Sequence, residues 1–509
     1  MLQLHNVSIT LKKDGRELVR GFSLTINDGD KAAVIGEEGN GKSTLLRWIA
    51  HPDRVESYAE CRGTRYCPGH IGFLSQENTV PPDTRIIDYL QGIDLYADLP
   101  MPPWELHGNR ELWTSERAFS VLSGGEKIKI RLVRLLAEHP DILLLDEPTN
   151  DLDLDTLLWL ETFIRAVPQP VLYVSHDETL LENTANIVVH LEQIKKKSAC
   201  RYTVERTGYR DYVENRLGRL DKQEQIARKQ RADYENQQAR WRQIYSKVEH
   251  QQNTITRADP GGARLLKKKI HALKSQEKRI ERQKEEFEDI PSVEDAISLV
   301  FDNASALPNG KRILDWELPV LEAGGRVLAS DLRLHITAGE RIGLVGENGA
   351  GKTTCLRRIW DVLSAKPELH AGYMPQEYGD VLEYGQTPVE FLVPSGEKTA
   401  VTRARSCLGS LRFKSEEMEQ PIGDLSDGQK AKLLLLHLML DACQVLILDE
   451  PTRNLSPLSN PVIRRSLAAF PGTILCVSHD RKFLKEVCTA VYRLSDKGLA
   501  PYEWPDQEA

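Results

Sequence analysis

The sequence lacks the long apolar run that a membrane-spanning helix requires. No segment approaches the roughly 18 uninterrupted apolar residues of a bilayer helix. Residues 1–8 also lack the basic start and the apolar stretch of a secretory signal peptide. We therefore expect a soluble, cytoplasmic protein that does not act at a membrane.

Cysteine is scarce as well, and the cysteines form no recognisable set. The chain has eight of them and no CxxC pair. Cys61 and Cys67 lie closest together, and no second cysteine pair follows them at the spacing of a zinc site. This pattern excludes a disulfide framework and gives no indication of bound zinc. We expect the cysteines to be reduced and structural.

The length and the distribution of charge divide the chain into parts. A chain of 509 residues exceeds one hydrophobic core and should form two or three domains. Residues 206–290 hold 21 Lys and Arg against 14 Asp and Glu, a net charge of +7, whereas the remainder carries 46 against 61, or -15. A basic segment therefore joins two acidic domains, and its charge favours a phosphate-backbone partner.

One set of nucleotide-binding motifs occurs twice, in the same order. A P-loop at residues 36–43 recurs at 346–353, and each is followed by a Gln, a Leu-Ser-x-Gly-x stretch, an Asp-Glu-Pro-Thr and a Ser-His-Asp. The signature Ser precedes the first Asp by 23 residues in both copies, and that Asp precedes the His by 30 in both. Such agreement is hard to explain by chance. The chain is predicted to be a tandem ATPase that uses ATP and Mg²⁺.

The P-loop chemistry predicts which residues bind phosphate. Glycines let backbone N–H groups close around phosphate oxygens, the lysine neutralises phosphate charge, and the hydroxyl that follows it ligates Mg²⁺. The residues predicted to bind ATP in the two P-loops are Gly36, Gly39, Gly41, Lys42, Ser43 and Thr44, and Gly346, Gly349, Gly351, Lys352, Thr353 and Thr354.

A carboxylate pair ends a buried apolar run in each copy. Such a pair beside the phosphates can supply a ligand for Mg²⁺, from the Asp, and an acceptor for the proton of the attacking water, from the Glu. An Asp by itself could equally be a strand-end cap, but the fixed distance to a His argues for a group that senses the γ-phosphate. The predicted catalytic residues are Glu147, Glu450, His176 and His479. The metal ligands predicted from these residue types are Ser43, Asp146, Thr353 and Asp449.

The fold is predicted to be α/β, with two P-loop domains joined by a long antiparallel helical hairpin. Short apolar runs such as residues 31–35, 142–145 and 171–174 alternate with helical patterns. Because these runs are apolar on both faces, we expect buried, mainly parallel strands. The predicted domains are a first ATPase domain at 1–205, the basic hairpin at 206–290 and a second ATPase domain at 291–509.

The basic segment has the composition of a long helix. No Pro or Gly lies between Arg219 and Asp259, and at about 1.5 Å per residue a helix of about 40 residues would reach about 60 Å. Asp259 to Gly262 then breaks the chain. Apolar residues at near-heptad spacing predict two antiparallel helices with a protruding tip. They are Leu217, Leu220, Ala227, Tyr234, Trp241, Tyr245, Val248, Ile270, Leu273 and Ile280. The aromatic members could pack in the helix seam, which we favour, or stack on RNA.

The motifs resemble those of ABC-type ATPases, whose distinguishing element is the signature at residues 122–126 and 425–429. The resemblance implies two domains packed head to tail, so that each ATP lies between the P-loop of one half and the signature of the other. Gln76 and Gln376 would then contact Mg²⁺ and water, and hydrolysis to ADP and phosphate would drive opening. The signature residues implied in nucleotide binding are Ser123, Gly124, Gly125, Glu126, Ser426, Asp427, Gly428 and Gln429.

Two ABC domains joined by a charged hairpin resemble the ABC-F proteins, which bind ribosomes rather than transport. Residues 449–459 are similar to the second-domain sequence of members that confer antibiotic resistance by protecting the ribosome. About 45 residues separate Gln76 from Leu122, too few for the arm insertion of housekeeping members, and 30 follow His479, so we expect no C-terminal extension. Both features favour the resistance group of the lincosamide, streptogramin A and pleuromutilin type.

The two copies also depart from the family pattern. Glu38 replaces the usual Asn of the first P-loop, Asp427 replaces a signature Gly, and Ser456 replaces an Asp. Residues 8–13 hold no aromatic side chain where the family usually stacks adenine. These departures predict two inequivalent sites.

The resemblance implies an ATP-gated monomer whose hairpin binds the 70S ribosome, ribosomal RNA and tRNA near the exit site and the peptidyl-transferase centre. It implies neither a DNA nor a membrane partner. Within the family, a translation factor that relieves stalled ribosomes without any drug is the alternative. A transporter subunit is less favoured because it needs no basic hairpin. DNA-maintenance ATPases differ because their coils interrupt a single head.

Overall fold

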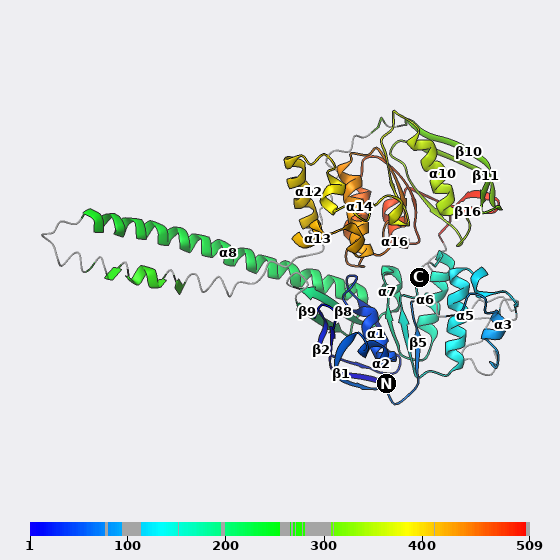
Figure 1. Cartoon of the computed structure of the whole chain (residues 1–509), viewed down its shortest axis with the longest axis horizontal. Helices are drawn as coiled ribbons and strands as arrows, with labels where there is room; N and C mark the ends of the chain where they lie inside the picture. The colour runs from blue at the N-terminus through cyan, green and yellow to red at the C-terminus, as the bar shows by residue number, and fades with distance from the viewer. Residues whose placement is uncertain are drawn as a thin grey trace. The chain divides into compact units, whose positions relative to one another are not determined.

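The computed structural model describes residues 1–76, 80–93, 113, 115–150, 152–194, 199–254, 265, 268–269, 271–276, 278–279, 307–308, 310–411 and 413–504. Contacts divide the chain into two compact units. One unit combines Met1–Arg210 with Glu294–Ala509, and the other is Asp211–Val293. The first unit contains two α/β halves, each with a sheet covered by helices (Figure 1).

The first half is built on a six-stranded sheet of order β5-β6-β7-β3-β8-β9. Its strands are parallel except β9, which pairs antiparallel with β8. They are β3 (Lys31–Ile35), β5 (Ile71–Leu74), β6 (Ile142–Asp146), β7 (Val171–Val174), β8 (Ile187–Ile194) and β9 (Ala199–Glu205). A separate antiparallel sheet of order β2-β1-β4 contains β1 (Leu2–Leu11), β2 (Glu17–Ile26) and β4 (Ala59–Tyr66). The helices are α1 (Lys42–Ala50), α2 (Pro52–Glu56), α3 (Ile86–Tyr89), α5 (Gly124–Ala137), α6 (Leu154–Ala166) and α7 (Glu178–Thr184).

The second half repeats this topology, with the sheet order β13-β14-β15-β12-β16-β17. Its strands are β12 (Arg341–Val345), β13 (Ala371–Met374), β14 (Val445–Asp449), β15 (Thr473–Val477), β16 (Ala490–Ser495) and β17 (Gly498–Pro501). A hairpin of β10 (Arg312–Ala323) and β11 (Arg326–Thr337) forms a two-stranded sheet. The helices are α10 (Lys352–Ser364), α11 (Pro388–Leu392), α12 (Lys398–Ser410), α13 (Ser415–Glu419), α14 (Asp427–Leu440), α15 (Asn460–Ala468) and α16 (Arg481–Val487).

The predicted α/β fold with two tandem P-loop domains is confirmed. The predicted runs at 31–35, 142–145 and 171–174 form β3, β6 and β7, all buried and all parallel. These strands are neighbours in the sheet, so their carboxyl ends lie at one edge. Loops at the carboxyl ends of parallel strands form the usual binding edge of such sheets. This edge therefore collects the P-loop, the carboxylate pair and the His of each half.

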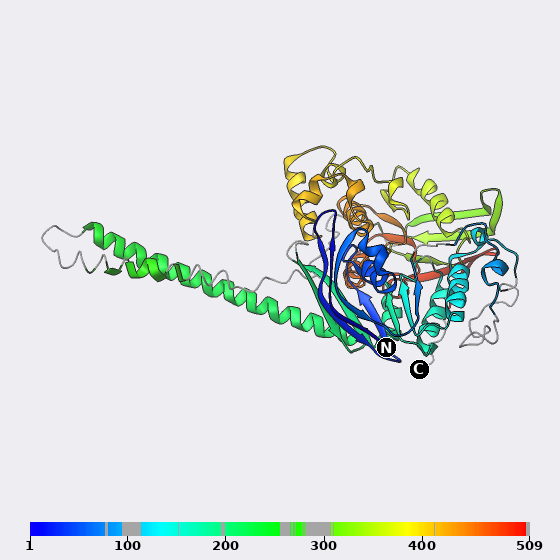
Figure 2. The same cartoon turned by 60° about the horizontal axis from the view of Figure 1, so that its bottom comes forward.

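The second unit is a helical hairpin, as predicted. Helix α8 (Tyr209–Thr254) has 46 residues, about 69 Å at 1.5 Å per residue, and starts ten residues before Arg219 because it continues through Gly218. Further helical segments run back beside it (Figure 2). The indole N–H of Trp241 donates to the backbone carbonyl of Leu273 at 2.9 Å, so the chain reverses between them.

The seam of the hairpin follows the heptad pattern. Ala227 and Val248 are buried, as is Leu273, whereas Leu217 is 38% exposed and lies outside the seam. Trp241 stacks on Tyr245 with ring centroids 4.9 Å apart. Seam packing is thus confirmed for Trp241. Ile270, Ile280 and residues 255–264, which include most of the predicted tip at 253–260, lie outside the described residues. No described helix of either unit is long and apolar enough to cross a bilayer.

Candidate nucleotide-binding sites

Each P-loop connects a central strand to the first helix of its half. Gly36 and Gly346 have φ of 148° and 153°, and a Cβ at these positions would lie 2.3 Å from the carbonyl oxygen of Leu191 and 2.6 Å from that of Leu494. Only glycine fits there, because any side chain would collide with backbone that cannot move. The tight approach of the two backbone segments fixes the start of each P-loop.

The P-loop lysines are held by their own loops. The Lys42 ammonium donates to the carbonyl oxygens of Gly36, at 2.8 Å, and Glu37, at 3.1 Å. Lys352 makes the same two bonds, at 2.9 and 3.0 Å, to Gly346 and Glu347. Burial lowers the pKa of both lysines, and the surrounding carboxylates oppose that effect. Each loop thus holds a buried cation at its centre, as phosphate binding requires.

The Asp of each carboxylate pair is buried, and apart from the hydroxyl of its own P-loop, Ser43 or Thr353, its oxygens have no hydrogen-bond donor among the described residues. Burial raises the pKa of Asp146 to about 6, partly offset by the nearby Ser43 hydroxyl. Burial also raises the pKa of Asp449, offset by Thr353 and Lys352. An orphaned carboxylate beside a hydroxyl is a donor set that fits Mg²⁺, which prefers oxygen ligands. The residues present therefore fit the metal at both sites.

The two Glu–His pairs differ in geometry. Both Glu147 and Glu450 have positive φ, which turns them out of their strands. His176 Nε2 lies 2.9 Å from Glu147 Oε1, and its Nδ1 lies 2.8 Å from the carbonyl oxygen of Leu455 in the other half. Both ring nitrogens of His176 thus face oxygens, one in each half, and these two contacts fix the orientation of the ring. His479 Nε2 lies 3.6 Å from Glu450 Oε1, and its buried Nδ1 has no hydrogen-bond partner among the described residues.

The electrostatics of the pairs differ in the same way. Burial opposes ionisation of Glu147, but the charge and hydrogen bond of His176 outweigh it, so the pKa of Glu147 is lowered. Burial and the neighbouring Asp449 raise the pKa of Glu450 to about 8. Burial, followed by Lys352, lowers the pKa of His479 to about 3. Ionisation is therefore favoured for Glu147, whereas Glu450 and His479 both favour their neutral forms.

Both signatures cap the helices that follow them. The Ser123 hydroxyl accepts from the backbone N–H of Glu126 at 3.2 Å, and the Glu126 carboxylate accepts from the Ser123 N–H at 2.8 Å. Ser426 and Gln429 form the same box at the start of α14, at 3.3 and 3.1 Å. Glu126 and Gln429 are thus engaged in capping boxes. Their predicted contact with nucleotide stays a prediction.

A cavity of about 1400 Å³ between the two halves collects most predicted site residues. Those that line it are Gly39, Gly41, Lys42, Ser43, Thr44, Gln76, Gly124, Asp146, Glu147, His176, Gly349, Gly351, Lys352, Thr353, Thr354, Gln376, Ser426, Asp427, Asp449, Glu450 and His479. Outside its lining lie Gly36, Gly346, Ser123, Gly125, Glu126, Gly428 and Gln429. The P-loop of the first half thus faces the signature of the second half across one cavity.

Sequence reasoning missed a network of ion pairs between the halves. Arg464 forms a bidentate pair with Glu178 at 2.6 and 3.1 Å, with side chains only 3% and 5% exposed. Further pairs join Arg481 to Glu161 and Asp177, Lys482 to Glu178 and Glu182, Lys432 to Glu37, and Arg493 to Asp155. These pairs all place the acid on the first half and the base on the second. Sequence signals could not have identified them, because the partners lie hundreds of residues apart.

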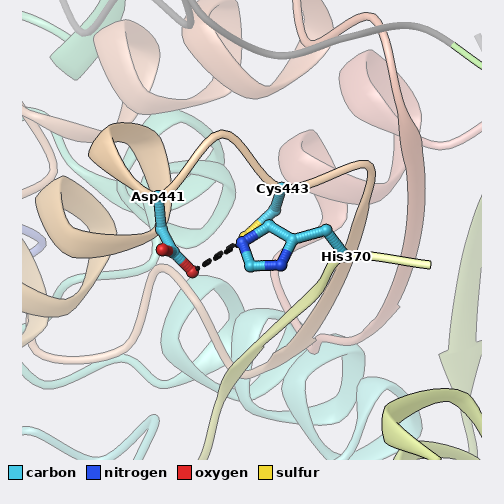
Figure 3. Close-up of side chains that lie close together, drawn as sticks. All are labelled: His370, Asp441 and Cys443. Carbon is cyan, nitrogen blue, oxygen red and sulfur yellow. Dashed lines mark hydrogen bonds and ion pairs between the residues drawn. The ribbon is translucent and has the colours of Figure 1, made fainter. Parts of the chain in front are cut away.

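A cluster of His370, Asp441 and Cys443 lies away from these sites (Figure 3). His370 Nε2 is 3.0 Å from Asp441 Oδ2, and the Cys443 thiol donates to the same oxygen at 3.7 Å. Burial and Asp441 raise the pKa of the thiol to about 12. The first half has an equivalent pair, His70 with Glu138 at 3.9 Å, without the cysteine. The repeated pair ties a strand to the end of a helix, which explains the cluster without a metal.

The fold and the paired P-loop sites define a protein with two ABC-type nucleotide-binding domains. A family model described as ABC transporter matches residues 19–150 and 329–453. The chain belongs to this family.

Its relatives are similar over nearly the whole chain. The ribosome protection protein VmlR of Bacillus subtilis (strain 168) is 30% identical over 508 residues, covering 98% of this chain and 87% of VmlR. The probable ATP-binding protein YheS of Escherichia coli (strain K12) is 26% identical, covering 97% and 79%. ABC transporter F family member 2 of Arabidopsis thaliana is 27% identical, covering 98% and 77%. Relatives in the ABC-F family thus agree with the sequence-based expectation at the level of the family.

Solved structures show the same fold at low identity. The structure titled RNase-L Inhibitor has a TM-score of 0.57 and 16% identity, covering 97% of this chain and 90% of that one. The archaeal ribosome recycling factor aABCE1, in complex with the stalk protein aP1, has a TM-score of 0.58 and 16% identity, covering 98% and 89%. At this identity the likeness supports the tandem ABC fold alone.

Proposed function

We propose that this protein is a cytoplasmic, monomeric, ATP-gated ABC-F protein that binds the 70S ribosome and protects it from antibiotics. The proposal is carried by the two nucleotide sites that face each other across one cavity. Nucleotide bound between the halves would contact both of them and draw them together. The basic hairpin between the halves and the similarity to VmlR support ribosome binding. The hairpin would act near the tRNA exit site and the peptidyl-transferase centre, through contacts with tRNA and ribosomal RNA.

In this proposal, each site hydrolyses ATP with residues of its own half. Lys42 and Lys352 balance phosphate charge. Asp146, Ser43 and Gln76 would hold Mg²⁺ at the first site, and Asp449, Thr353 and Gln376 at the second. Mg²⁺, when bound, neutralises charge on the phosphate oxygens.

Glu147 and Glu450 accept the proton of the attacking water as its oxygen bonds to the γ-phosphorus and the bond to ADP breaks. His176 and His479 orient those carboxylates. This arrangement is more complete at the first site, because contacts to Glu147 and to the Leu455 carbonyl fix both ring nitrogens of His176.

The function is tested by drug susceptibility of a sensitive host with and without the gene. Protection against lincosamides, group A streptogramins or pleuromutilins is the expected result. A host whose susceptibility does not change, but whose stalled ribosomes recover faster, would instead indicate a drug-independent translation factor. Co-sedimentation of the protein with ribosomes, compared with its binding to DNA and to membranes, separates these two ribosomal functions from a DNA-maintenance ATPase and from a transporter subunit. Binding to DNA or membranes in place of ribosomes would contradict the proposal.

Removing charge from the hairpin should weaken ribosome binding and flatten its salt dependence. Lys268 and Lys269 are exposed on a helical segment of the hairpin, and Lys267 lies outside the described residues. Each lost phosphate contact lowers the salt slope by about one unit. At 100° per residue the three cannot all face one way, so we expect the triple Ala variant to lose about one or two units.

Sedimentation with ribosomes at several salt concentrations measures this slope. Lys311→Ala with Lys497→Ala, two exposed lysines of the second half, is the matched control and should leave the slope unchanged. An unaltered slope in the triple variant would show that these lysines form only a solvated helix face.

The hairpin tip is predicted to be the effector of protection. Replacing residues 253–258 with Gly and Ser should abolish protection while leaving ATPase activity in place, because the tip belongs to a different compact unit from the ATP sites. Ile255 and Arg257 have no turn-forming role and are the preferred contacts, whereas Asp259 to Gly262 suffice to reverse the chain. ATPase rate, ribosome binding and drug susceptibility are measured together. Unchanged protection would show that the tip serves only the fold.

A further inference from the structure

Glu38 of the first P-loop contacts the signature helix of the second half. Its Oε2 accepts a hydrogen bond from the backbone N–H of Gly428 at 2.7 Å. Gly428 is the second residue of α14, and a Cβ there would lie 3.1 Å from the same carboxylate oxygen and 2.7 Å from the Asn454 carbonyl oxygen. A side chain at position 428 would collide with the Asn454 carbonyl and crowd the carboxylate of Glu38.

The contact satisfies a helix end that attracts anions. The first N–H groups of a helix have no partner within it, and the helix dipole favours negative charge there. In α14 the Ser426 hydroxyl accepts a hydrogen bond from the N–H of Gln429, and the Glu38 carboxylate accepts one from the N–H of Gly428. The adjacent Lys432–Glu37 pair, at 3.6 Å, adds a second link between the same two elements. A side-chain anion thus sits at the helix end where the family resemblance places the phosphates of ATP.

The second site is arranged differently. Asn348 takes the position of Glu38, and its backbone N–H donates to the side chain of Asp153 from the first half. Asp153 also caps α6 through the N–H of Thr156 at 2.9 Å. Its counterpart in the other half is Ser456. At the second site the acid that links the halves, Asp153, lies in the half opposite the P-loop. At the first site the linking acid, Glu38, lies in the P-loop itself.

We propose that Glu38 is an internal anionic ligand of the second signature helix, which joins the halves at the first site without nucleotide and competes there with the terminal phosphate of a nucleoside triphosphate. The inference rests on the proposed function, since it takes the first site to bind ATP. A diphosphate lacks the terminal phosphate and does not compete. Glu38 is therefore a residue that sets the preference of the first site between triphosphate and diphosphate.

The test measures binding of AMPPNP and of ADP, each with Mg²⁺, to the full chain with Lys352→Ala, so that the first site is observed. Glu38→Gln should raise AMPPNP affinity about tenfold, as expected when a like charge a few ångströms away is removed, and change ADP affinity less than about twofold. Glu37→Gln is the matched control, because it removes the same charge one residue earlier, and with it the pair with Lys432, but leaves the hydrogen bond to the Gly428 N–H at the helix end in place. It should shift both nucleotides alike.

A second variant keeps the test independent of how Glu38→Gln folds. Asn348→Glu, in a chain with Lys42→Ala, should lower AMPPNP affinity at the second site and spare ADP. Glu38→Gln with equal effects on both nucleotides, or with none, overturns the inference while leaving the proposed function intact. A parental first site that binds neither nucleotide overturns the proposed function and the inference with it.

Discussion

Replacing both Glu147 and Glu450 with Gln is expected to abolish ATP hydrolysis while ATP binding is retained. Gln keeps the shape of each side chain but cannot accept the proton of water, and a positioned general base contributes about 10²–10⁴-fold to a rate. The P-loop lysines and their carbonyl contacts do not involve either Glu. Because hydrolysis is what opens the halves in this proposal, the double variant should also accumulate on ribosomes when ATP is added.

Phosphate release and ribosome sedimentation measure the two parts of this prediction. Glu416→Gln, at an exposed position in α13, is the control and should behave as the parent. The single variants should differ, with Glu147→Gln losing more activity, because His176 holds Glu147 at 2.9 Å whereas His479 lies 3.6 Å from Glu450. Parental turnover in the double variant, or no accumulation on ribosomes, would contradict the assigned roles.

Replacing Arg464 with Met is expected to destabilise the pairing of the two halves by about 3 kcal/mol, the lower end of the usual cost of breaking a buried pair, because Lys482 still lies 3.3 Å from Glu178 and compensates part of its charge. Arg464 and Glu178 are almost fully buried, and the Arg464 guanidinium also bonds to Glu486 at 2.8 Å. The double variant Arg464→Met with Glu178→Gln should regain much of this loss, because it also removes the buried carboxylate that has lost its bidentate partner.

Urea unfolding of the full chain, arranged as a double-mutant cycle, gives the interaction energy. The matched control is Arg493→Ala, which breaks the pair with Asp155. This pair also joins a base of the second half to an acid of the first, but its side chains are 41% and 57% exposed. An exposed pair contributes about 0–1 kcal/mol. Equal losses for Arg464 and Arg493, or no recovery in the double variant, would show that burial of the pair is not what joins the halves.

The local patterns of the sequence were sufficient for each half. Residues 32–35 and 142–145 are apolar on both faces, and only a strand covered on both sides buries such runs, so their conformation followed from composition. The hairpin was predictable for a similar reason, because a heptad stripe can be buried only against another helix. Trp241 shows the limit of that reasoning: the pattern put it in the seam, but its bond to Leu273 depended on the register of two helices.

The sequence by itself determined the two P-loop domains, the order of the motifs and the helical nature of the hairpin, since each rests on residues close together in the chain. Only the tertiary structure decided how the halves differ. His176 reaches the Leu455 carbonyl across 279 residues, Glu38 reaches Gly428 across 390, and Arg464 reaches Glu178 across 286. Two of these contacts end on backbone atoms, which every residue carries, so side-chain identity gives no signal for them. They exist because the folded halves bring one surface against another, which no local pattern encodes.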